Sequence, residues 1–203
     1  VIEDKEGKEI AGFYMDLYAR SGKRGGAWMN DQISRREVNG KIQKPIAYLV
    51  CNFAAPVGDN PSLLTLRDVE TIFHEFGHGL HHMLTRQTEL AVSGISGVEW
   101  DAVEMPSQFM ENFVLNWDVM QTITHHVKTG KTMPRELFDK LVAAKNYGAG
   151  MANVRQIEFA LFDMLLHMDT HPEKDTVNKI LNEVRKEVAL SLIHISEPTR
   201  PLY

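Results

Sequence analysis

Residues 66–83 read LRDVETIFHEFGHGLHHM, and their apolar side chains recur every three or four positions. This spacing places the apolar side chains on one face and predicts an amphipathic helix. Thr65, followed three positions later by Asp68, is typical of an N-terminal helix cap. The apolar positions of this predicted helix are Leu66, Val69, Ile72, Phe73, Phe76, Leu80 and Met83.

The same stretch contains a pair of histidines with metal-binding spacing. His74 and His78 are four positions apart, so their imidazoles lie one turn apart on one helix face and can reach the same ion. A catalytic zinc site uses three protein ligands and leaves a position for water. Glu75 is then the expected general base for that water. The alternative is that the His74–His78 spacing is accidental. Gly77 argues against this, because a glycine inside a helix lowers its stability and the sequence shows no packing need for it. We expect one Zn²⁺ per chain.

The third zinc ligand must come from another segment. Residue 84 is Leu, which excludes a third histidine at the spacing that some zinc peptidases use. We expect a second helix over residues 98–120 and, within it, assign the ligand to Glu104, whose apolar neighbours leave a carboxylate in need of a cation. Glu99 is expected to stabilise the start of this helix. Glu111 is expected to be solvated or to accept a hydrogen bond.

Four other polar residues admit more than one interpretation. His81 shares the face of His74, and we expect it to pack or to support a ligand rather than to bind metal. Asp101 and Gln108 can orient Glu104 or make purely structural hydrogen bonds. Cys51 lies in an apolar run and is expected to be a small buried residue, with a catalytic thiol as the alternative.

The remaining chain predicts a mainly α protein with a small β-sheet (α+β). β-Branched and aromatic residues predict strands within residues 8–60, and helical periodicity dominates after residue 66. The glycine-rich residues 21–26 lack a full phosphate-binding motif and are expected to form a loop. The predicted strands are 10–18 and 46–53, and the predicted later helices are 134–146, 151–168 and 174–190.

Composition limits the possible partners and compartment. The net charge of −5 argues against nucleic acid and against an anionic membrane as main partners. No apolar run approaches the length of a membrane span. A single cysteine excludes an intrachain disulfide and fits a reducing compartment, so we expect a cytoplasmic location. The sequence does not indicate an oligomeric state.

Several segments together resemble the thimet oligopeptidase and oligopeptidase A family of zinc metallopeptidases, most closely its bacterial oligopeptidase A members. The resemblance extends over roughly residues 1–189. The segments are GFYMDLY (12–18), VCNF (50–53), HEFGHGLH (74–81), VEMPSQ (103–108) and RQIEFALFD (155–163).

This resemblance implies the zincin-like catalytic core of a helical oligopeptidase, with Glu104 as the third zinc ligand. It also implies a deep channel that admits short oligopeptides and excludes folded proteins. Residues 46–53 would form a strand near the zinc whose backbone can pair with an extended substrate. The loop of residues 93–97 would border the channel and could move.

The end of the chain departs from the family pattern. Residues 190–203 are expected to be a non-native tail, with a divergent natural C-terminus as the alternative, so residues 1–189 are predicted to be a partial catalytic domain. A family segment that supplies one His and two Tyr to the developing oxyanion has no counterpart here. Residues 147–150 resemble the family's tyrosine- and glycine-rich segment only superficially and predict a turn between helices.

The leading prediction is therefore a zinc metalloendopeptidase that hydrolyses short oligopeptides. A dipeptidyl carboxypeptidase of the same family is one alternative, because it uses the same core. An inactive zinc-binding fragment is another. A plain helical interaction domain is the third and predicts no bound metal.

Overall fold

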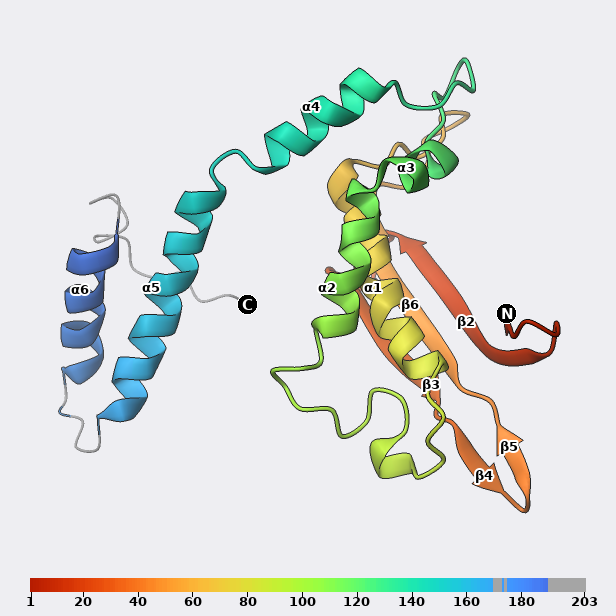
Figure 1. Cartoon of the computed structure of the whole chain (residues 1–203), viewed down its shortest axis with the longest axis horizontal. Helices are drawn as coiled ribbons and strands as arrows, with labels where there is room; N and C mark the ends of the chain where they lie inside the picture. The colour runs from red at the N-terminus through yellow and green to blue at the C-terminus, as the bar shows by residue number, and fades with distance from the viewer. Residues whose placement is uncertain (170–172, 174, 190–203) are drawn as a thin grey trace. The chain divides into compact units, whose positions relative to one another are not determined.

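The computed structural model describes residues 1–169, 173 and 175–189. The chain divides into two compact units, residues 1–135 and residues 136–203 (Figure 1). The predicted tail, residues 190–203, lies outside the described residues. Among the helices of the described part, none combines the length and the apolar content that crossing a bilayer requires.

The first unit contains a four-stranded mixed sheet in the order β1-β2-β6-β3. These strands are β1 (Ile2–Glu3), β2 (Glu9–Tyr18), β3 (Trp28–Ile33) and β6 (Ile46–Phe53). β6 runs parallel to β2 and antiparallel to β3, and residues 46–50 of β6 are paired on both sides. The expected strands are confirmed. β3 therefore occupies the second side of residues 46–50, and the expected pairing of an extended substrate with this strand stays a prediction for residues 51–53.

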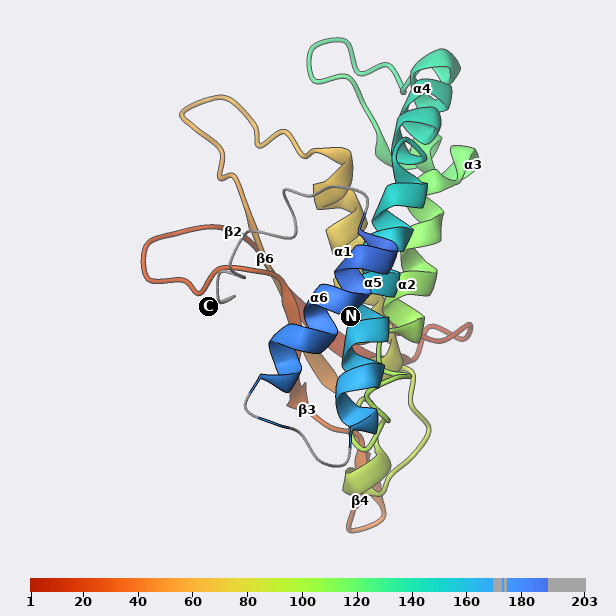
Figure 2. The same cartoon turned by 90° about the vertical axis from the view of Figure 1, so that its left-hand side faces the viewer.

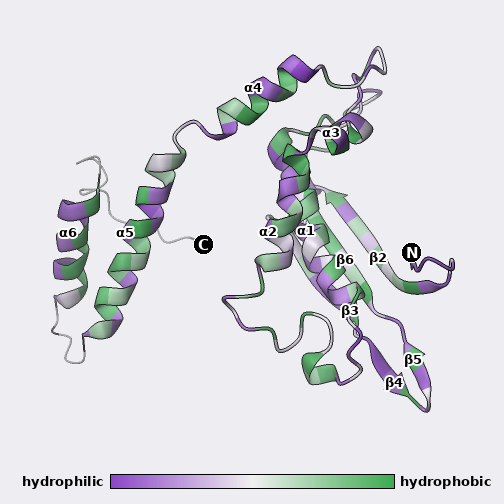
Figure 3. Ribbon diagram, viewed as in Figure 1, coloured by the Kyte–Doolittle hydropathy of each residue, from purple (hydrophilic) through white to green (hydrophobic). Residues whose placement is uncertain are grey.

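A separate hairpin precedes β6. It pairs β4 (Arg36–Val38) with β5 (Lys41–Gln43). All three residues of β4 are exposed, and Figure 3 shows this strand as mostly hydrophilic, whereas β6 is mostly hydrophobic. The hairpin therefore contributes little to the core, which lies against β6.

Helix α1 (Leu66–Met83) covers one face of the sheet. Alternate β6 residues Ala47, Leu49, Cys51 and Phe53 are buried, as expected for a strand with one face in the core. Ala11 and Ala47 pack with Met83, and Phe76 meets Phe13 edge to face with ring centroids 5.5 Å apart. Figures 1 and 2 show α1 between the sheet and α2 (Met105–Glu111). This packing fixes the helix that carries the histidines.

The predicted cap of α1 is confirmed. The Asp68 amide donates to the Thr65 hydroxyl at 3.2 Å, and the Thr65 amide donates to the Asp68 carboxylate at 2.8 Å. Each side chain thus satisfies a backbone N–H that the helix leaves free. At the other end, His82 is fully buried, and its Nε2 lies 2.9 Å from the Ile33 carbonyl at the end of β3.

The predicted continuous helix over residues 98–120 is wrong. Residues 100–104 form turns, and three short helices follow: α2, the 3₁₀ helix η2 (Asn112–Leu115) and α3 (Trp117–Ile123). Pro106 lies in the first turn of α2, where its missing N–H costs nothing, so the helix begins next to the proline. Asn116 starts α3, because its side chain accepts from the amides of Asp118 and Val119.

The second unit is helical in the described residues. Helix α4 is Arg135–Lys145, α5 is Ala149–Met168 and α6 is Thr176–Val188, close to the predicted ranges. Tyr147 and Gly148 form the predicted turn before α5, with Gly148 at a φ of 73°. Helices α5 and α6 pack side by side. The architecture is mainly α with a small mixed sheet, as predicted.

Candidate metal centre

Three predicted ligands converge from two helices. His74 and His78 lie on α1, and Glu104 is the residue immediately before α2. Glu104 Oε2 lies 3.2 Å from His74 Nε2 and 3.2 Å from His78 Nε2. One potential ligand atom from each residue lies within 4.8 Å of the other two. Glu104 is therefore brought to the histidines from a helix start and not, as predicted, from the middle of a helix.

These distances fit a tetrahedral zinc ion. Ligand bonds of about 2.0–2.1 Å place two ligand atoms of a tetrahedron about 3.3 Å apart. The two measured N···O distances of 3.2 Å are close to that edge. Two imidazoles and one carboxylate also match the donor set of a catalytic zinc site that keeps an open position. Two of the three distances between the proposed ligand atoms therefore suit zinc, and the third is at most 4.8 Å.

Close packing of α1 against α2 brings Glu104 into reach. A Cβ atom at Gly77 would lie 2.6 Å from both the Pro106 carbonyl oxygen and Ser107 Cα. Gly77 is thus required by packing, which corrects the sequence-based view that it has no packing need. Only glycine allows the two backbones to approach so closely.

Ser107 holds the Glu104 carboxylate. Its buried hydroxyl lies 2.9 Å from Glu104 Oε2 and 2.8 Å from the Glu104 carbonyl oxygen, so one proton is shared between two acceptors. The Glu104 side chain is 48 % exposed, so the expected apolar setting is wrong. Gln108 and Asp101, predicted as possible orienting residues, make no described side-chain contact with Glu104.

Glu111, for which the sequence allowed either solvation or a hydrogen bond, contacts His74. Its Oε1 lies 2.7 Å from His74 Nδ1, on the opposite side of the ring from Glu104. The predicted hydrogen-bonding role of Glu111 is confirmed, and the alternative that Glu111 is only solvated is wrong. Glu99 does not begin a helix; its carbonyl accepts from Ala102 and Val103 in a turn, so its predicted helix-stabilising role is wrong.

Glu75 is almost fully buried beside the three predicted ligands. It is 6 % exposed, and its Oε2 is buried without a hydrogen-bond partner among the described residues. Burial raises the pKa of Glu75; the neighbouring His74 opposes this, and Glu104 adds to it. Burial also lowers the pKa of His78, with Glu104 opposing the change. Both directions favour groups that exchange protons or donate a lone pair near neutral pH.

A small polar cavity gives solvent access to this centre. Its volume is about 320 Å³, and its lining residues are Arg67, Glu70, Thr71, His74, Glu75 and Glu111. One expected ligand and the expected general base therefore line the same cavity. Charged and hydroxyl groups dominate this lining, which suits water and a peptide backbone rather than an apolar ligand.

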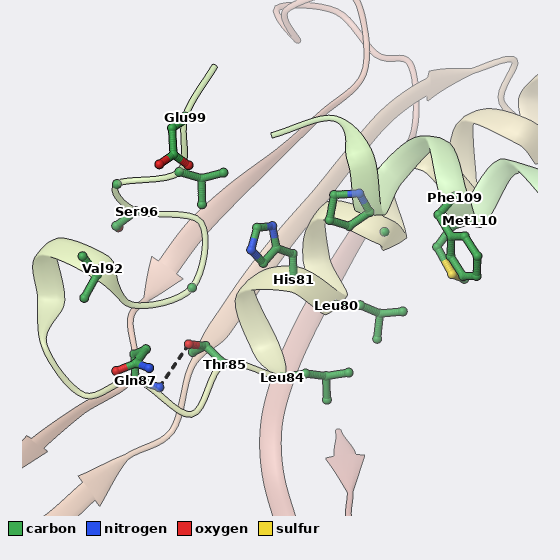
Figure 4. A pocket seen from close by; sticks show the side chains of 15 residues that line it. Leu80, His81, Leu84, Thr85, Gln87, Val92, Ser96, Glu99, Phe109 and Met110 are labelled. Carbon is green, nitrogen blue, oxygen red and sulfur yellow. Dashed lines mark hydrogen bonds between the residues drawn. The ribbon is translucent and has the colours of Figure 1, made fainter. Parts of the chain in front are cut away.

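A second, larger pocket of about 620 Å³ lies between α1, α2 and the loop that joins them (Figure 4). His81 faces it, whereas none of the predicted zinc ligands lines it. Gly94, Ser96 and Gly97 also line it, so the 93–97 loop borders a pocket. The Ser93 hydroxyl donates to the carbonyls of Arg35 and Gln87, which anchors the start of that loop.

Cys51 does not have the properties of a catalytic nucleophile. Its side chain is buried in β6, and burial followed by the charge of Glu75 raises its thiol pKa to about 11. The thiolate, which is the reactive form, is then scarce at neutral pH. The prediction of a small buried residue is confirmed.

Known peptidases resemble this chain over most of its length. Residues 1–198 match Peptidase family M3. Oligopeptidase A of Salmonella typhimurium is 53% identical over 188 residues, which are 91% of this chain and 28% of that protein. The Arabidopsis thaliana organellar oligopeptidase A is 51% identical over 171 residues, 82% of this chain and 22% of that protein.

A relative named for a different activity is less similar. The dipeptidyl carboxypeptidase of Salmonella typhimurium is 34% identical over 200 residues, 98% of this chain and 28% of that protein. The chain thus spans about a quarter of the length of these curated relatives. Because the family match extends over nearly every residue and includes both helices of the histidine and glutamate cluster, the chain belongs to peptidase family M3.

Proposed function

We propose that this chain carries the zinc site of a metalloendopeptidase with a zincin-like core. His74, His78 and Glu104 are the proposed ligands of one Zn²⁺, and Glu75 is the proposed general base. The observation that carries the proposal is the convergence of three ligand atoms at spacings that suit tetrahedral zinc.

The surrounding residues support peptide hydrolysis. A bound zinc ion supplies Lewis acidity that polarises a peptide carbonyl and acidifies a water molecule. Glu75 takes a proton from the attacking water as its oxygen bonds to the carbonyl carbon. Glu75 then gives that proton to the amide nitrogen as the C–N bond breaks. Its buried, unpartnered Oε2 is available for this transfer.

Short oligopeptides are the proposed substrates. The similarity to oligopeptidase A, at 53% identity, exceeds that to the dipeptidyl carboxypeptidase, at 34%, and so favours internal cleavage. We also propose a cytoplasmic location, which one relative, named as a probable cytosolic oligopeptidase A, supports. Another relative is named as chloroplastic or mitochondrial, so location differs among the relatives.

A peptidase assay on the purified chain tests this function. Because the oxyanion donors expected from the family resemblance have no counterpart here, we expect the zinc-loaded chain to cleave a quenched fluorescent peptide with blocked ends internally but inefficiently, and not after zinc removal. Release of C-terminal dipeptides from free-ended peptides, with no cleavage of blocked ones, would instead support the dipeptidyl carboxypeptidase. Bound zinc without turnover would support a zinc-binding chain that lacks activity alone. Absence of metal binding would contradict the proposal.

A further inference from the structure

One face of α2 contacts the His74 ring at both of its nitrogen atoms. Glu104 and Glu111 are seven residues apart, so their side chains lie on the same side of α2, two turns apart. Glu104 Oε2 lies 3.2 Å from Nε2, and Glu111 Oε1 lies 2.7 Å from Nδ1. The imidazole of His74 is thus held between two carboxylates from one short helix.

The chemistry of these contacts determines the proton position. An ionised carboxylate only accepts hydrogen bonds, so the short contact with Glu111 places a proton on His74 Nδ1. In a neutral imidazole, Nε2 then carries a lone pair, and it faces the Glu104 oxygen. Two electron-rich atoms in this position repel each other unless a cation or a proton lies between them.

We infer that Glu111 is a positioning residue of the metal site, which fixes the tautomer and orientation of His74 so that Nε2 is presented as a ligand. This inference rests on the proposed zinc site. Carboxylates that accept a hydrogen bond from the second nitrogen of a ligating histidine raise its basicity and restrict its rotation.

The two histidines are held by different means. His78 is the more buried of the two, with 10 % of its side chain exposed, against 26 % for His74. The Nδ1 of His78 is buried and has no hydrogen-bond partner within the described residues. Packing therefore holds His78, whereas the more exposed His74 depends on Glu111. Loss of Glu111 should release one ligand and leave the other in place.

The test compares zinc affinity in three variants. Glu111→Ala removes the carboxylate, Glu111→Gln keeps an acceptor without the charge, and Glu99→Gln is a matched control on an exposed carboxylate outside the cluster. Competition with a chromophoric chelator measures the dissociation constant. We expect Glu111→Ala to weaken zinc binding by about 10–100-fold, Glu111→Gln to weaken it less, and Glu99→Gln to leave it unchanged.

A second measurement separates positioning from a structural tie between α1 and α2. In the zinc-free chain, long-range ¹H–¹⁵N NMR should show the proton of His74 on Nδ1, and this preference should be lost in Glu111→Ala while circular dichroism is unchanged. Equal affinity of Glu111→Ala and Glu99→Gln, or an unchanged tautomer, would overturn the inference and leave the zinc site intact. Failure of the unaltered chain to bind zinc would overturn both.

Discussion

Glu75 is a buried carboxylate whose Oε2 has no protein partner in the described part of the chain, although burial of an unpaired acceptor is costly. Such a group is tolerated where a substrate or a reacting water completes its hydrogen bonds. The adjacent cavity, which Glu75 shares with His74, provides room for that water.

Substitution of Glu75 by Gln tests the role of that carboxylate. Glutamine keeps the shape and cannot accept the proton, so we expect peptide hydrolysis to fall by about 10²–10⁴-fold. Zinc content should stay at one per chain, because the substitution leaves all three proposed ligands in place. Paired measurements of turnover and metal content check this, and unchanged turnover would exclude Glu75 as the general base.

At the scale of elements, the contact between α1 and α2 depends on Gly77. Alanine is intrinsically a better helix residue by about 1 kcal/mol. At this position, however, its Cβ would meet backbone atoms of Pro106 and Ser107, which cannot move aside as a side chain can. The close contact between α1 and α2 therefore makes glycine more favourable than alanine at position 77.

We expect Gly77→Ala to lower the free energy of unfolding by about 1–3 kcal/mol through overpacking, and to weaken zinc binding by displacing Glu104. Gly150→Ala is the matched control, because Gly150 is also helical and a Cβ at this position would meet no atom within 4 Å. That control should be neutral or stabilising. Urea denaturation compares the two, and a neutral Gly77→Ala would mean that the helices are not so closely packed.

The pair of α5 and α6 has its own buried ion pair. Glu158 Oε1 lies 3.1 Å from Arg185 Nε, and the two side chains are 5 % and 7 % exposed. Burial raises the pKa of Glu158, but the hydrogen bonds and charges of Arg155 and Arg185 together outweigh burial and lower it from 4.5. A lowered folded pKa means that this stabilisation is present above about pH 4.5 and is lost as the pH falls through the folded pKa.

We expect Glu158→Ala to cost about 3–5 kcal/mol at neutral pH, because it leaves Arg185 buried without its partner. The cost should shrink progressively as the pH falls below 4.5 and through the lowered folded pKa, where the unaltered chain also loses the charge of Glu158. Glu136→Ala, which breaks an exposed pair with Lys140, is the control and should cost less than about 1 kcal/mol. Amide hydrogen exchange in α5 and α6 measures the cost of Glu158→Ala, and exchange in α4 measures the cost of Glu136→Ala. Similar costs would contradict the buried pair.

The sequence predicted the long elements well and the short ones poorly. Periodic apolar residues and the Thr65–Asp68 cap identified α1, because these signals are local. The break-up of residues 98–120 was missed, although Pro106 and Asn116 carry the local signals for two helix starts. The histidines were found from spacing alone. The contact of Glu111 with His74, 37 residues apart, depends on how α1 and α2 pack, which periodicity does not reveal.

At the scale of the whole molecule, the proposed ligands all lie within residues 1–135, the first of the two compact units. Zinc would join α1 to α2, and both helices belong to this unit. We expect saturating zinc at about 100 times its dissociation constant to stabilise this unit by about 2.7 kcal/mol. Hydrogen exchange should show slower opening of α1 and not of α6, and equal protection of both would contradict a site confined to residues 1–135.

Metal analysis combined with X-ray absorption spectroscopy of the purified, zinc-loaded chain tests the proposed ligand set most directly. The account predicts one zinc ion per chain with two imidazole nitrogens at about 2.0–2.1 Å and carboxylate oxygen in its coordination sphere. Glu104→Ala should lose the protein oxygen ligand and weaken zinc retention, while Glu99→Gln should leave both unchanged. Substoichiometric zinc in the unaltered chain, or an identical spectrum from Glu104→Ala, would contradict it.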